Sequence, residues 1–447
     1  MRIEKSLFYQ RILFIAFWIR ATWGFCAEEL VPPLDGLKPI VYMAFDAVLV
    51  FLGIVMMERK RDKLFAAVFV VVAGITTCYY NGLSVLFYVN GLRDFISYLF
   101  VVPIVGYFLR DAERRERFVT DFDRQLFWFL VLQVPCMLYQ FIMYGAGDAG
   151  GGSLGYGNSG IISTLIFVIC FYFMKKRMDP ERYVASLWEN KIYLLLLIPS
   201  QLNETKITFL FFPMFFLLLL PINRKLFLRL LFAIPLMLVL VVLLGMGYMA
   251  SIGRSEANRM FDLDFMMEVY LYDDGQTAER AEALFDAGMD FAEADIPRFY
   301  KILYLSDFDK QYPGHRWTGL GVGQFKGGTM IEATKFYKEN EWMLSGTMIY
   351  VVQLLIQLGI IGVILSLWFF WLMFSPPEKG LKRDYNIQFF IIFMFVLIMV
   401  YNDSIRYCFM MLPIVYVVME SWYSNTPVAE INDGEEEGDA KLIAEGV

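Results

Sequence analysis

Several charged side chains lie at the ends of long apolar runs, where they could act on an anionic substrate. Arg93 opens one run, Lys206 lies in a polar break between two short runs, and Arg406 follows Asp403 in a tight turn. An ionisable residue at membrane depth usually faces protein or a wet cavity and often belongs to a functional site. Long basic side chains can also extend to the membrane interface as simple anchors. Both interpretations stay open for these residues.

A glycine-rich segment, Gly319-Leu320-Gly321-Val322-Gly323, follows Arg316. Dinucleotide-binding loops have similar glycine spacing, but no strand–turn–helix pattern surrounds this one. Glycines allow close backbone approach to a ligand and unusual dihedral angles. Nearby bases favour a phosphate-bearing ligand, with a purely structural turn as the alternative. These bases are Arg298, Lys301, Lys310, Arg316, Lys326, Lys335 and Lys338.

Candidate groups for proton transfer are few. His315 is the only histidine and has no partners at metal-ligand spacing, so we interpret it as structural. Glu339 and Glu341 precede a long apolar run, where either could serve as a general base or simply begin a solvated helix. The five cysteines lie in or beside apolar runs and are interpreted as packing residues. We predict no metal and no cofactor.

The elements that must position these groups are membrane-spanning helices. The 447-residue chain is 58% hydrophobic and only 19% charged, a balance that would expose too much apolar surface on a soluble protein. Several apolar runs approach the roughly 20 residues that cross a bilayer. We predict an all-α polytopic membrane protein of about twelve helices. The predicted spans cover residues 7–25, 39–57, 64–80, 93–109, 126–144, 158–174, 192–201, 207–220, 230–249, 348–374, 387–401 and 407–423.

Basic clusters predict the orientation of these spans. They fall in every second connection, near Arg59, Arg114, Lys175, Arg224 and Lys382, as the positive-inside rule requires. Merging the short seventh and eighth spans would move Arg224 outside, so we keep them separate. Both termini are then cytoplasmic, and one large loop between the ninth and tenth spans is periplasmic or extracellular. The predicted units are helices 1–9 (residues 1–249), the loop (250–345), helices 10–12 (346–424) and an acidic, disordered tail (425–447).

The large loop divides by charge. Carboxylates dominate residues 260–297, whereas bases dominate residues 298–338. A short amphipathic helix is predicted over residues 277–291, with Ala278, Ala281 and Leu284 on one side. The basic half contains the glycine-rich segment and faces Arg93 and Lys206 from the same side of the membrane. We therefore expect chemistry at the outer surface.

The order of these features resembles the O-antigen ligase/polymerase superfamily of GT-C-type membrane glycosyltransferases. Such proteins have a dozen helices and a large outer loop with an Arg, a glycine-rich turn and a helix ending in a G-h-h-G pattern. Matching elements here are Arg298, the turn ending at Gln324-Phe325, and Gly359-Ile360-Ile361-Gly362, with Leu92-Arg93, Gly157-Asn158-Ser159 and Thr205-Lys206 earlier in the chain.

The resemblance implies a metal-independent enzyme of the bacterial inner membrane that joins undecaprenyl-diphosphate-linked oligosaccharide repeat units of O-antigen, capsule or exopolysaccharide. Its partners would be that lipid-linked donor, membrane lipid and a possible chain-length regulator, with no nucleic acid. Arg93, Lys206 and Arg298 would neutralise the donor diphosphate, and Glu341 would act as the base. The remaining candidate substrate-binding residues are Arg254, Arg316, Gly321, Gly323 and Arg406.

Three alternatives stay open. Many ligases of this superfamily carry a His-Asn pair before the G-h-h-G pattern, but Met348 and Ile349 stand there, which favours a polymerase over a ligase. A transporter or lipid-linked-oligosaccharide flippase would show midplane polar residues, broken helices and often two similar halves. A dolichol-type enzyme would carry acidic metal ligands in its first outer loop, where Glu28 and Glu29 stand.

We predict that Lys206→Ala or Arg298→Ala abolishes chain extension, because each variant loses a positively charged side chain that would neutralise the donor diphosphate. Glycan gels of cells carrying each variant would measure extension, and membrane fractionation would confirm insertion. Full-length polymer from both variants would contradict the assignment.

Overall fold

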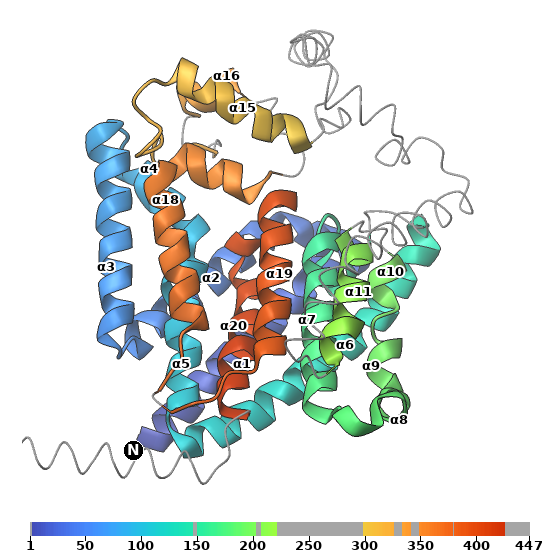
Figure 1. The fold of residues 1–447 in the computed structure, drawn as a ribbon. Helices are drawn as coiled ribbons and strands as arrows, with labels where there is room; N and C mark the ends of the chain where they lie inside the picture. The colour runs from blue at the N-terminus through green and yellow to red at the C-terminus, as the bar shows by residue number, and fades with distance from the viewer. Residues whose placement is uncertain are drawn as a thin grey trace, which may run out of the picture.

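The described part of the chain is helical throughout and contains no strand. The computed structural model describes residues 2–145, 150–202, 207–220, 298–325, 333–340, 348–378 and 380–424. Five of its helices are long and apolar enough to cross a membrane, or six if a bent pair is counted as one span. Figure 1 shows these helices as one bundle, with α15 and α16 above it. This architecture is that of a polytopic membrane protein.

Helices occupy most of the predicted spans, but several begin or break at unexpected residues. The predicted ninth span, residues 230–249, and the predicted helix 277–291 lie outside the described residues. The main elements are α1 (Arg2–Phe25), η1 (Cys26–Leu30), η2 (Pro32–Leu37), α2 (Lys38–Met56), α3 (Lys60–Gly74), η3 (Ile75–Tyr80), α4 (Val85–Leu92), η4 (Arg93–Phe95), η5 (Ser97–Val101), α5 (Val102–Arg110), α6 (Ala112–Tyr144), η6 (Gly152–Leu154), α7 (Ser159–Arg177), η7 (Pro180–Arg182), α8 (Tyr183–Glu189), α9 (Lys191–Leu195), α10 (Pro199–Leu202), α11 (Ile207–Leu219), α15 (Arg298–Gln311), α16 (Lys335–Glu339), α18 (Tyr350–Phe374), α19 (Tyr385–Tyr401), η9 (Ser404–Arg406) and α20 (Cys408–Ser424).

Helix α6 begins fourteen residues before the predicted span at residue 126. The first turns of α6 are rich in charged residues, so hydropathy predicts only the apolar part of this helix as a span. Asp111 caps the helix, because its carboxylate accepts a hydrogen bond from the Arg114 backbone N–H at 3.0 Å. The fourth predicted span differs in another way: it starts at Val85 and bends by 58° between the helices Val85–Phe95 and Ser97–Arg110.

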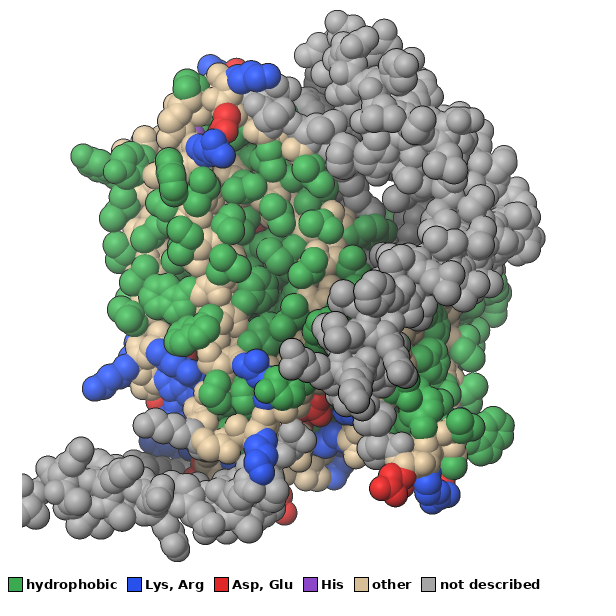
Figure 2. All heavy atoms as spheres, in the orientation of Figure 1, with side chains coloured by type: hydrophobic (Ala, Val, Ile, Leu, Met, Phe, Trp, Pro, Cys, Tyr) green, Lys and Arg blue, Asp and Glu red, His purple; other side chains and the backbone are tan. Residues whose placement is uncertain are grey.

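Basic side chains gather at one end of the bundle, here called the basic end. Arg110 pairs with Glu58 at 2.8 Å, Arg115 lies over the Tyr423 ring, and Lys176 pairs with Glu420 at 2.9 Å. Figure 2 shows most visible Lys and Arg side chains at the lower end, below a broad belt of hydrophobic side chains. The described basic clusters thus share one side, as the alternation of charge along the sequence requires.

The segment from α8 to α11 crosses the bundle and returns. Tyr183, which follows the basic residues of α7, donates a hydrogen bond from its hydroxyl to the Phe216 carbonyl at 3.0 Å. Asn386, near the start of α19, donates to the Leu218 carbonyl at 2.8 Å. The C-terminal turn of α11 therefore lies at the basic end, close to the start of α8. This arrangement fits two short spans rather than one merged span.

Two helices form the centre of the bundle. In α20 every described residue from Cys408 to Tyr423 is buried, and nearly all of α7 is buried as well. A helix buried on every side is surrounded by other helices rather than by lipid, which places α7 and α20 inside the bundle. Aromatic contacts fill the space around them, such as the stacked rings of Phe17 and Phe409, 4.9 Å apart, and of Phe171 and Phe390, 4.2 Å apart.

A buried turn around η6 enters the end of the bundle opposite the basic end. Gln140 accepts a hydrogen bond from the Gly152 N–H at 2.7 Å, and Gln133 accepts one from the Ser153 N–H at 2.9 Å. Gly24 of α1 packs so closely that an added Cβ would lie 1.8 Å from the Leu154 carbonyl oxygen. The two glutamines of α6 are therefore structural, because they satisfy backbone groups that water cannot reach.

Helix α18 is broken at Gly359, where the sequence predicts one continuous span. Gly359 has φ 60° and ψ −154°, a conformation that residues with a side chain rarely adopt. Figure 1 shows the two halves of α18 meeting at a sharp bend. The glycine-rich segment satisfies the carbonyls at the end of the first half, since Leu320 and Gly321 N–H donate to the Ile356 and Gln357 carbonyls at 2.7 and 2.9 Å.

The N–H groups at the start of the second half of α18 bind the residues just before the glycines. The first free N–H groups after the break, on Ile360 and Ile361, donate to the Arg316 and Trp317 carbonyls at 3.0 and 3.1 Å. A helix end leaves such groups without intrahelical partners. The segment before Gly323 therefore satisfies the backbone groups that the break in α18 leaves without intrahelical partners.

We predict that Gly359→Ala destabilises the protein by roughly 2–5 kcal/mol, from backbone strain and overpacking. An added Cβ would lie 2.5 Å from the Trp317 carbonyl. Thermal unfolding of purified protein, followed by intrinsic fluorescence, would measure the loss. Gly36→Ala is the matched control, since its Cβ would meet nothing within 4 Å. Equal unfolding temperatures for the two variants would contradict this account.

Candidate functional site

Arg93 lies at the bend that follows α4 and pairs with a carboxylate of α2. Its Nε donates to Asp46 Oδ2 at 2.7 Å, and both side chains are partly exposed. The aspartate lies inside the apolar run of α2, where an ionised carboxylate without a partner would be strongly destabilising. Each residue therefore compensates the charge of the other and orients it.

Arg406 is the centre of a second ion-pair group in the turn between α19 and α20. Its guanidinium lies 2.7 Å from Asp403 Oδ2 and 3.4 Å from Asp94 Oδ1, and it donates to the Tyr407 hydroxyl at 2.9 Å. Burial raises the pKa of Asp403, and the charges of Arg406 and Lys301 offset this only in part. Burial alone would lower the pKa of Arg406, but the nearby carboxylates outweigh it and raise that pKa.

Arg20, near the end of α1, is a buried cation without an ion pair among the described residues. Its side chain is 5% exposed, and its guanidinium carbon lies 3.6 Å from the centre of the Tyr42 ring. Its Nη1 is buried and has no hydrogen-bond acceptor among the described residues. Such a group is costly in a low-dielectric interior unless an anion completes it. Arg20 is thus a buried cation with a hydrogen-bond donor left for an anionic ligand.

These groups belong to one cluster at the end of the bundle opposite the basic end, which we call the arginine cluster. Arg20 lies within electrostatic range of Asp46 and Tyr407, and Asp403 lies within that range of Asp94 and Lys301. The cluster brings together cations from four separate parts of the chain. Its charged members are the cations Arg20, Arg93, Lys301 and Arg406 and the carboxylates Asp46, Asp94 and Asp403.

The predicted glycine residues border this cluster. Gly323 (φ 93°) packs on α4, where a Cβ on Gly91 would lie 2.4 Å from the Gly323 nitrogen. Gly321 (φ 90°) packs on η3, where its Cβ would lie 2.8 Å from Thr77 Cα. Because Gly91 is two residues before Arg93, the glycine-rich segment holds the backbone that carries this arginine. Close packing accounts for both glycines, and a ligand-binding role for them stays a prediction.

The other predicted residues divide into three groups. Arg316 lies at the surface with its side chain 70% exposed, 3.8 Å from Asp309, and only its backbone carbonyl is used by the fold. Arg298 begins α15, and its side chain is not described. Lys206, Arg254 and Glu341 lie outside the described residues.

The neighbouring carboxylate Glu339 is engaged at the surface. It accepts a hydrogen bond from the Tyr312 hydroxyl at 3.2 Å and lies 3.5 Å from Lys335. Burial and this carboxylate raise the pKa of Tyr312. His315 Nδ1 is buried and has no partner among the described residues.

Glu28 and Glu29, in the segment that follows α1, are paired with neighbouring residues. Glu28 accepts hydrogen bonds from Lys38 and from the Tyr156 backbone, and Glu29 accepts one from the Tyr144 hydroxyl at 2.7 Å. No group of three or more His, Cys, Asp or Glu side chains in the described ranges is arranged to hold a metal ion.

Sequence reasoning missed Arg20, Asp46, Asp94 and Lys301 as site residues. Arg20 and Asp46 carry a clear signal, because a charge inside an apolar run is rare and usually faces protein. Asp94 was obscured by its neighbour Arg93, and Lys301 by the many bases of the loop. Only the fold shows that these four approach one another.

No protein-family model and no curated protein matches the chain. The resemblance drawn from its motifs therefore stays a prediction.

We predict that Arg406→Met destabilises the protein by roughly 3 kcal/mol, because Asp403 and Asp94 lose their shared cation in a mostly buried site. Adding Asp403→Asn should recover part of that loss. The measurement is the free energy of unfolding in detergent.

Arg316→Met serves as the control, since its ion pair is long and largely exposed and contributes less than about 1 kcal/mol. An Arg406→Met variant as stable as this control would show that the ion-pair group does not support the turn.

Proposed function

We propose that this protein is a polysaccharide repeat-unit polymerase of the bacterial inner membrane. It would join undecaprenyl-diphosphate-linked oligosaccharides of O-antigen, capsule or exopolysaccharide at the outer face. The observation that carries the proposal is the arginine cluster, with the unpartnered Nη1 of Arg20 beside Arg93 and Arg406. Guanidinium groups recognise phosphate oxygens through paired, charge-assisted hydrogen bonds, so a diphosphate suits this cluster.

The distribution of charge supports an outer-face site. If the basic end faces the cytoplasm, as the positive-inside rule states, the arginine cluster faces outward. Both termini would then be cytoplasmic, and the segment that carries α15 and α16 would be periplasmic or extracellular. A lipid-linked sugar translocated to the outer leaflet would present its diphosphate at this level.

The reaction needs little covalent chemistry from the protein. The acceptor hydroxyl oxygen attacks the anomeric carbon of the donor, and the bond from that carbon to the diphosphate oxygen breaks. The diphosphate leaves with the bonding electrons, and the hydroxyl proton passes to a base. Arginines that are already oriented can stabilise the charge that develops on the leaving group. Asp46, Asp94 and Asp403 orient these arginines, because their carboxylates pair with the guanidinium groups of Arg93 and Arg406.

The remaining assignments rest on the motif resemblance. Lys206 and Arg298 would add charge to the diphosphate site, with Arg254 or Arg316 assisting, and Glu341 would accept the proton. Glu339 is less suited to that role, since Tyr312 and Lys335 already occupy its carboxylate. A chain-length regulator is the expected protein partner.

A second candidate, a transporter or lipid-linked-oligosaccharide flippase, is favoured by the broken helices. Helix α18 breaks at Gly359, and the span that contains Arg93 bends by 58°. Buried glutamines of α18 also lack partners among the described residues, including both amide atoms of Gln357. Transporters place broken helices and polar groups around a substrate site. The polymerase is preferred because the cations of the arginine cluster lie at one end of the bundle, whereas a transporter site would lie near its middle.

We predict that Arg20→Gln abolishes chain extension, since it removes a cluster cation that has no ion pair among the described residues and whose buried Nη1 is left for the diphosphate. The variant would complement a deletion strain, and glycan gels would show single-repeat products in place of the polymer ladder. Arg11→Gln on the exposed side of the same helix is the control and should restore the ladder.

Other outcomes would separate the alternatives. A full ladder from Arg20→Gln would contradict the proposed site. In the deletion strain itself, unattached polymer would indicate a lost ligase, and lipid-linked repeats confined to the cytoplasmic leaflet would indicate a lost flippase.

A further inference from the structure

An apolar groove runs between α2 and α3 near the basic end of the bundle. Although a turn of only three residues joins them, the two helices diverge, and η5 lies between them. Phe100 of η5 forms part of the floor. Its ring fits there because Gly53 has no side chain: a Cβ would lie 2.4 Å from that ring. The groove has a volume of about 530 Å³, within the range of small-ligand sites.

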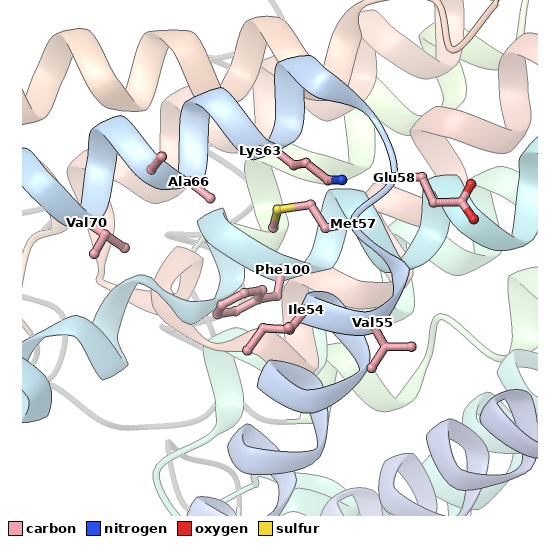
Figure 3. A pocket seen from close by; sticks show the side chains of 9 residues that line it. Ile54, Val55, Met57, Glu58, Lys63, Ala66, Val70 and Phe100 are labelled. Carbon is pink, nitrogen blue, oxygen red and sulfur yellow. The ribbon is translucent and has the colours of Figure 1, made fainter.

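The walls of the groove are apolar and open to the surface. Ile54 of α2 is 64% exposed, and Val70 of α3 is 36% exposed. Figure 3 shows these side chains with Ala66 and Phe100 along the groove, and Lys63 reaching from α3 toward the turn that carries Met57 and Glu58. The body of the groove therefore suits a hydrocarbon chain, and its end is polar.

Charge at the polar end favours an anionic headgroup. Arg110 already pairs with Glu58, at 2.8 Å, which neutralises that carboxylate. Lys63 has no carboxylate within ion-pairing distance among the described residues, so its ammonium charge remains at the mouth of the groove. Lys60 lies one turn earlier, is exposed and does not line the groove, so it serves as a matched control for Lys63.

We propose that this groove binds one anionic phospholipid of the leaflet at the basic end. Its acyl chain lies along Ile54, Ala66 and Val70, and its phosphate contacts Lys63. Burial of hydrocarbon does not select this lipid, because bulk acyl chains are equally apolar. Selection comes from the headgroup, since a basic side chain at the membrane surface favours anionic lipid by about fivefold. The site is separate from the arginine cluster and independent of the proposed reaction.

The test uses the full chain in nanodiscs that contain equal amounts of phosphatidylglycerol and phosphatidylcholine. Native mass spectrometry of the released protein would report the lipid retained. We expect one phosphatidylglycerol retained in about fivefold preference. Lys63→Gln should bring the ratio of the two lipids close to one, and Lys60→Gln, outside the groove, should leave most of the preference.

A second pair of variants tests the groove itself. Ala67→Trp places a large side chain in the groove from an exposed position, and retained lipid of both kinds should fall. Val71→Trp, also exposed on α3 but outside the groove, should retain lipid like the unmodified protein. Gel filtration confirms that each variant folds.

Three results would overturn the proposal. The first is equal retention of the two lipids by the unmodified protein. The second is the same loss in the control variants as in the groove variants. The third is displacement of phosphatidylglycerol by an equal amount of undecaprenyl phosphate, which would assign the groove to a polyprenyl lipid.

Discussion

The backbone hydrogen bonds made across the break in α18 are the constraint on which the half of the molecule opposite the basic end depends. A helix interrupted within the bundle exposes carbonyl and N–H groups that lipid cannot satisfy. Here the segment from Arg316 to Gly321 accepts two of those hydrogen bonds and donates two more. The large connection before α18 is therefore fastened into the helical bundle through its backbone, close to Gly359.

Other contacts spread outward from this joint. Leu320 and the first half of α18 share an apolar cluster with Tyr304 and Phe308 of α15, so the joint also seats the helices above the bundle. Gly323 packs on Gly91, next to the bend that carries Arg93. The segment that satisfies the break in α18 therefore also packs on the backbone next to Arg93, where only glycines allow such close contact.

The charged site obeys a second requirement, that buried charges be compensated. Arg93 and Arg406 are held by carboxylates, whereas Arg20 lies over the Tyr42 and Phe409 rings and has no ion pair in the part of the chain that the structure describes. A cluster built in this way is rigid and has positive charge in reserve, which is what binding of a diphosphate would require. The same arrangement could also support translocation of an anionic lipid, so the chemistry must be decided by the product formed.

The sequence by itself determined the class of protein, most helix positions and the separation of basic clusters to one side, because hydropathy and charge are local properties of the chain. It also drew attention to Arg93 and Arg406 from their positions at the ends of apolar runs. Only the tertiary structure decided that Gly359 breaks α18, that Gly321 packs on η3 and Gly323 on α4, and that Arg20 belongs with the other arginines. These facts depend on contacts between segments that are far apart in the sequence, which no local pattern specifies.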